Sequence, residues 1–549
     1  MLGILDVTSA FLLTPIPQGD GFPVFALTPP RYLVRQGLAQ EGELWILTHA
    51  VYGLRESPKL WSDFRDSQLL NLRCVVNGVE LQLLKGKLDT NWWRVVQTSD
   101  GQVVGGLITY VDDFLLAGCA EVIEALAKAI QSIWKTTPLT LATPHQPLRF
   151  LGVEILVQGL GFVLSQQAYA EELLRLNNVK PTALGKIPCP RDLVSFDTLL
   201  TDEAPAEESV RTAQRLTGEI LWLSQRTRPD LAFTACVLAT LSTKAPDRAA
   251  RIAERALAYV QQTKAFALTA DADDTGLVAY SDASFAPDGN RSHTGWVVFL
   301  YGSPVCWRSA RQAFVTLSTA ESELVAGLDA VVALQSAEAM LGEFGVFNLG
   351  KTLKVDSQSA LAIAIGQGSW RTRHLKVRAN YLREQYEAGE IIPVYCPGVE
   401  QAADLLTKAL PAARILELAA IWGLFEHCPE DPRQAEAVAV DLPTHPQYPQ
   451  IKLLFLLLAM TQIQSAKCQP ELFDEFEGDV HQVELSTDLM FMLLVGFVGI
   501  GFIAVWELAK WCLRRHSLCR IHSTAKQRKL QRLRDRTAQA IEVIQSLHI

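Results

Sequence analysis

Residues 103–117 read VVGGLITYVDDFLLA, so that two adjacent carboxylates, Asp112 and Asp113, stand between two apolar runs. Apolar runs of this length are typical of buried strands, and a tight hairpin would expose both acids at its tip. Neighbouring carboxylates are costly to bury because like charges raise each other's pKa, whereas a bound divalent cation favours their ionisation. The pattern predicts either an ordinary polar turn or a metal-binding hairpin.

Four further blocks accompany this hairpin in a fixed order along the chain. Residues 5–12 read LDVTSAFL and place Asp6 at the end of a short apolar run, and residues 52–61 read YGLRESPKLW. FLGVEI at 150–155 and RTRPDL at 226–231 follow. Together the blocks resemble the reverse transcriptase of copia-type retrotransposons, although Glu56 stands where that family commonly has Gln.

The resemblance implies a polymerase palm in which Asp6, Asp112 and Asp113 are catalytic and bind two Mg²⁺ ions, with Mn²⁺ as the alternative. Tyr110 would contact substrate, and Phe11 would act as a steric gate against a ribose 2′-hydroxyl unless it is an ordinary core residue. The implied partners are an RNA template, a DNA primer and dNTPs. Only five residues precede Asp6, where the family has its fingers region, so we expect weak primer extension by this chain.

Four more acids occur in the order strand, helix, strand, helix. They are Asp282 after the predicted strand 277–281, Glu323 in the predicted helix 320–341, Asp356 after the predicted strand 352–355, and Asp404 in a later predicted helix. Each alone is better explained as a helix cap, a turn residue or a favourable first-turn charge. The order of all four favours a shared site in a mixed α/β domain.

This region resembles the copia ribonuclease H domain, including RSHTG at 291–295 and RTRHL at 371–375. The resemblance implies that the four acids bind two Mg²⁺ ions and hydrolyse the RNA strand of an RNA–DNA hybrid. Glu323 is preferred over Glu321 because the family motif has its acid directly before Leu324. Contact with phosphate is expected from four residues, with a solvated helix end as the alternative: Arg371, Arg373, His374 and Lys376.

An α/β multidomain chain is expected from 549 residues of which 49% are apolar. The predicted order is a palm with truncated fingers at 1–170, a helical connection at 171–275, a ribonuclease H-like domain at 276–412, an acidic linker at 413–488, a transmembrane helix at 489–506 and a basic tail at 507–549. The net charge of -9 argues against general nucleic-acid affinity, so any groove for nucleic acid must be local.

Residues 489–506 contain no charged side chain, which meets the length requirement for a membrane-spanning helix, with a buried globular helix as the alternative. Asp488 precedes the segment and Lys510 begins a basic one. The positive-inside rule therefore predicts a protein anchored in the lipid bilayer by this helix, with a cytoplasmic C-terminus. The 10 cysteines show no zinc spacing, and without the tail the cytoplasm or nucleus is expected.

Three functions are compatible with these patterns. The first is an enzyme with both polymerase and ribonuclease H activity. The second is a truncated or decayed copy that keeps ribonuclease H activity only, or neither activity. The third is a non-catalytic, membrane-tethered nucleic-acid-binding or structural protein. The oligomeric state is left open.

Overall fold

The computed structural model describes residues 1–18, 22–143, 146–158, 161–183, 185–195, 205–269, 276–287, 291–366 and 376–427. Arg371, Arg373 and His374 lie outside the described residues, as do the predicted segments 489–506 and 507–549. The chain divides into two compact units, residues 1–10 with 61–477 and residues 11–60 with 478–549. Each unit is described by itself.

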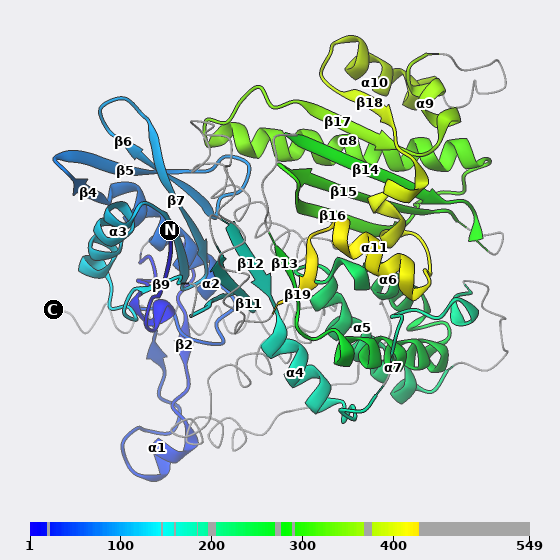
Figure 1. Cartoon of the computed structure of the whole chain (residues 1–549). Coiled ribbons are helices and arrows are strands. Elements are labelled where there is room, and N and C mark those ends of the chain that lie inside the picture. Colours follow the sequence, from blue (N-terminus) through cyan, green and yellow to red (C-terminus); the bar gives the residue numbers. More distant parts are fainter. Residues whose placement is uncertain are drawn as a thin grey trace. The chain divides into compact units, whose positions relative to one another are not determined.

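The hairpin of residues 103–117 lies inside a seven-stranded antiparallel sheet of the first unit, with strand order β4-β5-β6-β7-β8-β1-β9 (Figure 1). The strands are β1 (Leu2–Asp6), β4 (Arg73–Val76), β5 (Val79–Lys85), β6 (Trp92–Gln97), β7 (Val103–Tyr110), β8 (Asp113–Gly118) and β9 (Thr140–Leu141). Helix α3 (Ala120–Ile133) buries one apolar face, including Ile123 and Ile130. Helix α2 (Ser57–Asn71) begins in the other unit and ends in this one.

A second antiparallel sheet has the strand order β10-β11-β12-β13-β19. Its strands are β10 (Leu148–Phe150), β11 (Val153–Gln158), β12 (Gly161–Ser165), β13 (Phe266–Thr269) and β19 (Leu424–Glu426). Leu164 pairs with Leu268, and Leu268 with Leu424. Residues 148–165 therefore join distant strands instead of extending the first sheet.

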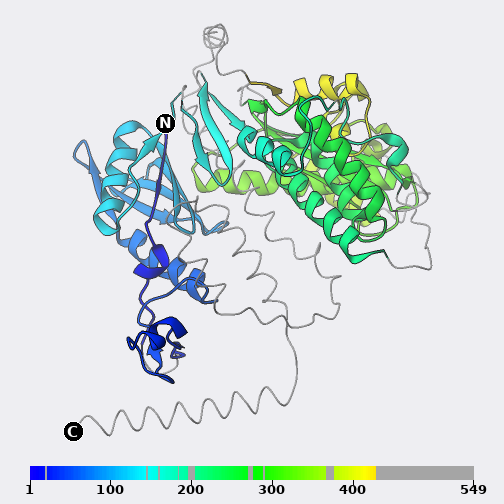
Figure 2. The ribbon, with the colours of Figure 1, turned by 90° about the horizontal axis from the view of Figure 1, so that it is seen from below.

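The predicted helical connection contains α4 (Gln167–Leu176), η2 (Arg191–Leu193), α5 (Glu207–Ser224), η3 (Pro229–Leu231), α6 (Ala232–Leu241) and α7 (Pro246–Gln262). Helices α5, α6 and α7 pack side by side (Figures 1 and 2). A buried ion pair stabilises this bundle. The Arg228 guanidinium donates to both oxygens of Asp230 at 3.0 and 2.7 Å, and the Tyr259 hydroxyl donates to Asp230 at 2.8 Å.

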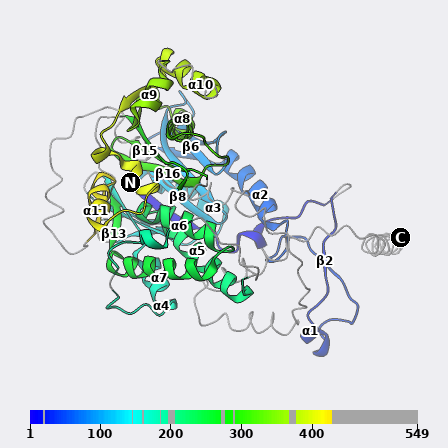
Figure 3. The ribbon, with the colours of Figure 1, turned by 90° about the vertical axis from the view of Figure 1, so that its right-hand side faces the viewer.

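The third sheet is mixed, with the order β16-β15-β14-β17-β18. Strands β14 (Leu277–Ser284), β15 (His293–Leu300) and β16 (Ser303–Arg311) are antiparallel, while β17 (Lys351–Val355) and β18 (Ile392–Tyr395) continue the sheet in parallel from β14. Helix α8 (Thr319–Glu343) packs on β14 and β15. Helices α9 (Gln358–Ala364) and α10 (Lys376–Glu387) lie together beside the parallel strands (Figures 1 and 3).

Within the described residues, α8 is the one helix long and apolar enough to cross a membrane, and half of its apolar window is buried. It covers the third sheet, so its apolar character is explained by core packing.

The acidic linker predicted from residue 413 needs correction at its start. Residues 412–426 form α11 (Ala412–Ile421) and β19 because Leu418 and Trp422 are fully buried.

The described part of the second unit is small. It contains η1 (Ala10–Leu13) from its second residue onward, β2 (Ala26–Leu27), α1 (Arg31–Arg35) and β3 (Trp45–Ile46), and β2 pairs with β3. Phe11 belongs to this unit, and its ring meets Tyr52 edge-on with centroids 5.3 Å apart. The predicted steric gate therefore packs against the block of residues 52–61.

Candidate functional site

Three carboxylates converge at one end of the third sheet: Asp282 in β14, Asp356 directly after β17, and Asp404. Their ligand oxygens lie within 4.8 Å of one another, and no other three acidic, His or Cys side chains come so close within the described chain. Ser281 is opposite Val355 on the parallel strands β14 and β17. The residues that follow them, Asp282 and Asp356, therefore lie side by side. The sequence placed Asp404 in a helix, and it lies in the short 3₁₀ helix η7 (Ala402–Leu406).

Glu323 faces the same acids from helix α8. It is 6% exposed, and its Oε2 atom is buried without a hydrogen-bond partner in the described part of the protein. Burial, followed by the charges of Asp282 and Asp356, raises the pKa of Glu323 to about 9. Glu321 has a different environment, since it accepts a hydrogen bond from the Leu317 amide at 2.7 Å and pairs with Arg378 at 3.2 Å.

The group of acids is electrostatically suited to a cation. Asp282 is only 1% exposed, and burial is the main cause of its raised pKa. Burial, with the charge of Asp282, also raises the pKa of Asp356 to about 6. Closely spaced carboxylates in a poorly hydrated site repel one another, and a divalent cation relieves that repulsion. The all-oxygen donor set and the unpartnered oxygen of Glu323 fit Mg²⁺ or Mn²⁺.

Two neighbours of Asp404 complete the arrangement, and their roles were not predicted. The Thr407 hydroxyl donates to Asp282, and the Lys408 ammonium lies 3.1 Å from Asp282 and 2.5 Å from Asp404. Burial alone would lower the pKa of Lys408, but the two carboxylates reverse the effect and raise it. The sequence feature that could have predicted the contact between Lys408 and Asp404 is their spacing of four residues.

The RSHTG block has a structural role around this site. His293 is fully buried, its Nε2 lies 2.9 Å from the Ser309 Oγ, and Ser309 donates to the Leu406 carbonyl at 2.7 Å. Burial lowers the pKa of His293 to about 3, so the ring stays neutral. These bonds tie β15 and β16 to η7, and thereby position Asp404.

The palm hairpin brings its acids together less tightly. Asp6 is opposite Asp113 across β1 and β8, and the Val7 amide donates to the Asp112 carbonyl at 2.9 Å. Burial raises the pKa of Asp6, and a hydrogen bond with Asp113 opposes that rise. Within the described residues, these acids do not form a compact group of three ligand atoms like that of the third sheet.

The turn between β7 and β8 is held by two side chains of α2. Val111 has a φ of 54°, an unfavourable left-handed conformation for a β-branched residue. Its carbonyl accepts the Trp61 indole at 2.5 Å and Arg65 at 3.4 Å. Asp66 pairs with Arg65 at 2.8 Å. The block of residues 52–61 thus supplies Trp61 as a support for the turn that carries Asp112.

Comparisons with known proteins agree with the resemblance of the motifs. No family model matches the chain. Retrovirus-related Pol polyproteins from transposons RE1 and RE2 of Arabidopsis thaliana are each 26% identical over 415 residues, covering 74% of this chain and 26% of the relative. The corresponding polyprotein from transposon TNT 1-94 of Nicotiana tabacum is 24% identical over 381 residues, covering 66% of this chain and 27% of the relative.

The chain therefore spans about a quarter of the length of the curated relatives it matches. These homologues confirm the predicted resemblance to copia-type retrotransposon Pol. Among solved structures, LC11-RNase H1 from compost is 19% identical, with a TM-score of 0.21, covering 24% of this chain and 92% of that one. The foamy viral protease-reverse transcriptase in complex with dsDNA is 12% identical, with a TM-score of 0.18, covering 72% and 68%.

Proposed function

We propose that this homologue of retrotransposon Pol polyproteins hydrolyses the RNA strand of RNA–DNA hybrids at the acids of its third sheet, and carries a polymerase palm for RNA-directed DNA synthesis. The convergence of Asp282, Asp356 and Asp404, with the unpartnered Glu323 oxygen beside them, is the observation that supports the first activity. These four acids come from four separate segments of the chain, and a bound divalent cation would relieve the repulsion between them.

In the proposed hydrolysis, the four acids would hold two divalent cations, which supply charge to activate water and to stabilise the leaving oxygen. Asp282 is fixed by the Thr407 hydroxyl, and Asp404 by the turn that His293 supports through Ser309. These contacts pre-orient the carboxylates before substrate arrives, which reduces the reorganisation needed at the reaction. Selection of the hybrid would rest on backbone shape and 2′-hydroxyl contacts.

The full chain should cut the RNA strand of a labelled RNA–DNA hybrid when Mg²⁺ is added, and leave the same RNA intact when single-stranded or paired with RNA. The reason is that sites of this class respond to the hybrid geometry rather than to sequence. Gel analysis of the three substrates provides the measurement. Equal cleavage of all three, or none of the hybrid, would reject the assignment.

The polymerase proposal rests on the opposition of Asp6 and Asp113 beside the turn that carries Asp112. Primer extension on an RNA template with dNTPs, by this chain or by a longer polyprotein that contains it, should be lost in Asp112→Asn. The matched variant Asp100→Asn alters an exposed acid in the turn between β6 and β7 and should extend normally. Extension by Asp112→Asn at the rate of the unmodified protein would exclude this palm as the polymerase centre.

We also propose, from the sequence alone, that residues 489–506 span a bilayer and leave the C-terminus in the cytoplasm. The full chain should then resist carbonate extraction from membranes. Arginine at both Gly499 and Gly501 should release it, because each central charge costs about 2.5–3.5 kcal/mol on insertion scales. Extraction of the unmodified chain by carbonate would show that the segment is not a membrane anchor.

A further inference from the structure

Lys408 is a positive charge placed directly on the acids of the third sheet. Its ammonium contacts Asp282 at 3.1 Å and Asp404 at 2.5 Å, two of the three carboxylates whose oxygens lie within 4.8 Å of one another. Arg414 adds a weaker contact to Asp404 at 3.3 Å. The ammonium thus occupies two of the carboxylates that a cation bound by the three acids would need.

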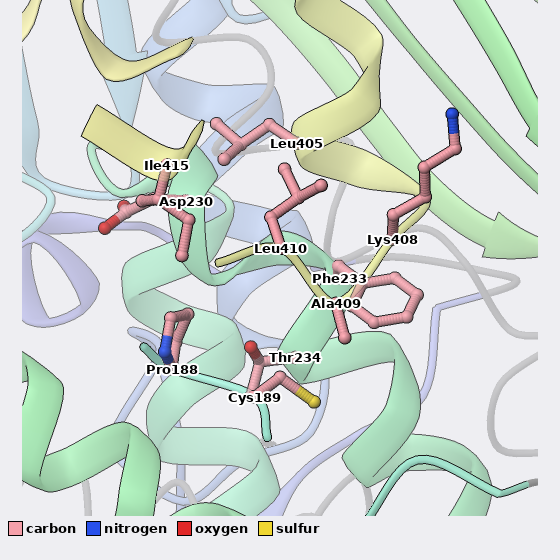
Figure 4. Close-up of a pocket in the computed structure, with 10 residues that line it drawn as sticks. All are labelled: Pro188, Cys189, Asp230, Phe233, Thr234, Leu405, Lys408, Ala409, Leu410 and Ile415. Atoms are coloured by element: carbon pink, nitrogen blue, oxygen red, sulfur yellow. The ribbon is translucent and has the colours of Figure 1, made fainter. Parts of the chain in front are cut away.

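The rest of the Lys408 side chain borders a pocket that is lined mostly by apolar residues. Its stem lines a small pocket together with Phe233 of α6 and Leu405 of η7, while the ammonium points away from that pocket (Figure 4). An apolar seat for the methylene groups with an outward charged end is the usual way to fix a long basic side chain. Because this seat is part of the fold, the ammonium is presented to the acids at a high effective concentration.

We propose that Lys408 is a built-in counter-cation that competes with divalent metal ions for Asp282 and Asp404, and so sets the metal concentration that the site requires. A bound divalent cation needs the same carboxylate oxygens, and two cations sharing them repel each other. The ammonium must therefore leave at least one carboxylate when the metal binds. This inference rests on the proposed function, since it takes the acids as the metal site.

The test is a titration of the full chain with Mn²⁺, followed by electron paramagnetic resonance of the free ion. All proteins carry Asp112→Asn, so that the palm hairpin contributes less to binding. Lys408→Met keeps the apolar stem and removes the charge, and should bind Mn²⁺ about tenfold more tightly, an order-of-magnitude expectation for removing one nearby charge. Lys408→Arg keeps the charge and should bind as weakly as the parent. Lys408→Gln serves as a second neutral variant if Lys408→Met does not fold.

Lys351→Met is the matched control because Lys351 is also a lysine between two acids, at 2.6 Å from Glu338 and 2.9 Å from Glu390. Neither acid belongs to the three-carboxylate group, so Lys351→Met should leave Mn²⁺ affinity unchanged. Equal or weaker binding by both neutral Lys408 variants would overturn the inference. Asp356→Asn separates this inference from the proposed function. If it abolishes the Mn²⁺ binding of the parent, the three acids are the metal site even when the Lys408 variants contradict the inference. If it leaves Mn²⁺ binding unchanged, the proposed function itself is rejected.

Discussion

Asp356→Asn should reduce the Mg²⁺-dependent cleavage of an RNA–DNA hybrid by more than about a hundredfold, because loss of even an outer partner of a metal ligand costs about 10–100-fold. The substitution keeps the shape of the side chain and removes one of the charges that would hold the cations. It also removes a like charge from beside Asp282, so the variant should be at least as stable as the parent without metal. Cleavage rates and thermal unfolding of the same preparations measure both effects.

Glu321 and Glu323 provide a control that differs by two positions in one helix. Glu323→Gln should lose activity like Asp356→Asn, since its unpartnered oxygen faces the acids. Glu321→Gln should keep most of it, because Glu321 is engaged by Leu317 and Arg378. Loss of activity in Glu321→Gln with normal cleavage by Glu323→Gln would show that the two acids have been assigned the wrong way round.

Arg228→Met should destabilise the protein by about 3–5 kcal/mol, the usual cost of leaving one member of a buried ion pair without its partner. Asp230 is 3% exposed and accepts from Arg228 and Tyr259, so the substitution leaves a buried carboxylate with one hydroxyl donor. Urea unfolding followed by circular dichroism gives the change in the free energy of unfolding.

Arg211→Met is the matched control for this substitution. Arg211 pairs with Glu207 on the surface of α5, where the two side chains are 60% and 79% exposed. Exposed pairs of this kind contribute about 0–1 kcal/mol, so the midpoint of unfolding should barely move. A loss below about 1 kcal/mol in Arg228→Met would mean that the pair does not stabilise the helical connection.

Local pattern was sufficient to predict much of the third sheet. The predicted helix 320–341 corresponds to α8, and the strands 277–281 and 352–355 correspond to β14 and β17. Acids that follow predicted strands can be identified from the sequence because residues at the ends of neighbouring parallel strands lie at the same edge of the sheet. Strand β16 was missed, although it pairs with β15 along eight residues.

The features that depend on distant partners could not be predicted. Residues 148–165 have ordinary strand patterns, and only the pairing of Leu164 with Leu268 assigns them to the second sheet. Lys408 follows Asp404 by four residues, yet it lines a pocket with Phe233, which lies 175 residues earlier in the sequence. Trp61 and Arg65 likewise support a turn about fifty residues away. Tertiary contacts of this range leave no periodic signal in the sequence.

Crystals grown with Mn²⁺ and a hybrid offer the most direct test of the metal centre, by anomalous diffraction. We expect anomalous peaks beside the oxygens of Asp282, Asp356 and Asp404, with Glu323 as a further ligand and the Lys408 ammonium displaced from at least one carboxylate. Metal–oxygen distances should be about 2.0–2.2 Å, as for small hard cations. Bound hybrid without an anomalous peak at these acids, and with Lys408 still paired to both Asp282 and Asp404, would contradict this expectation.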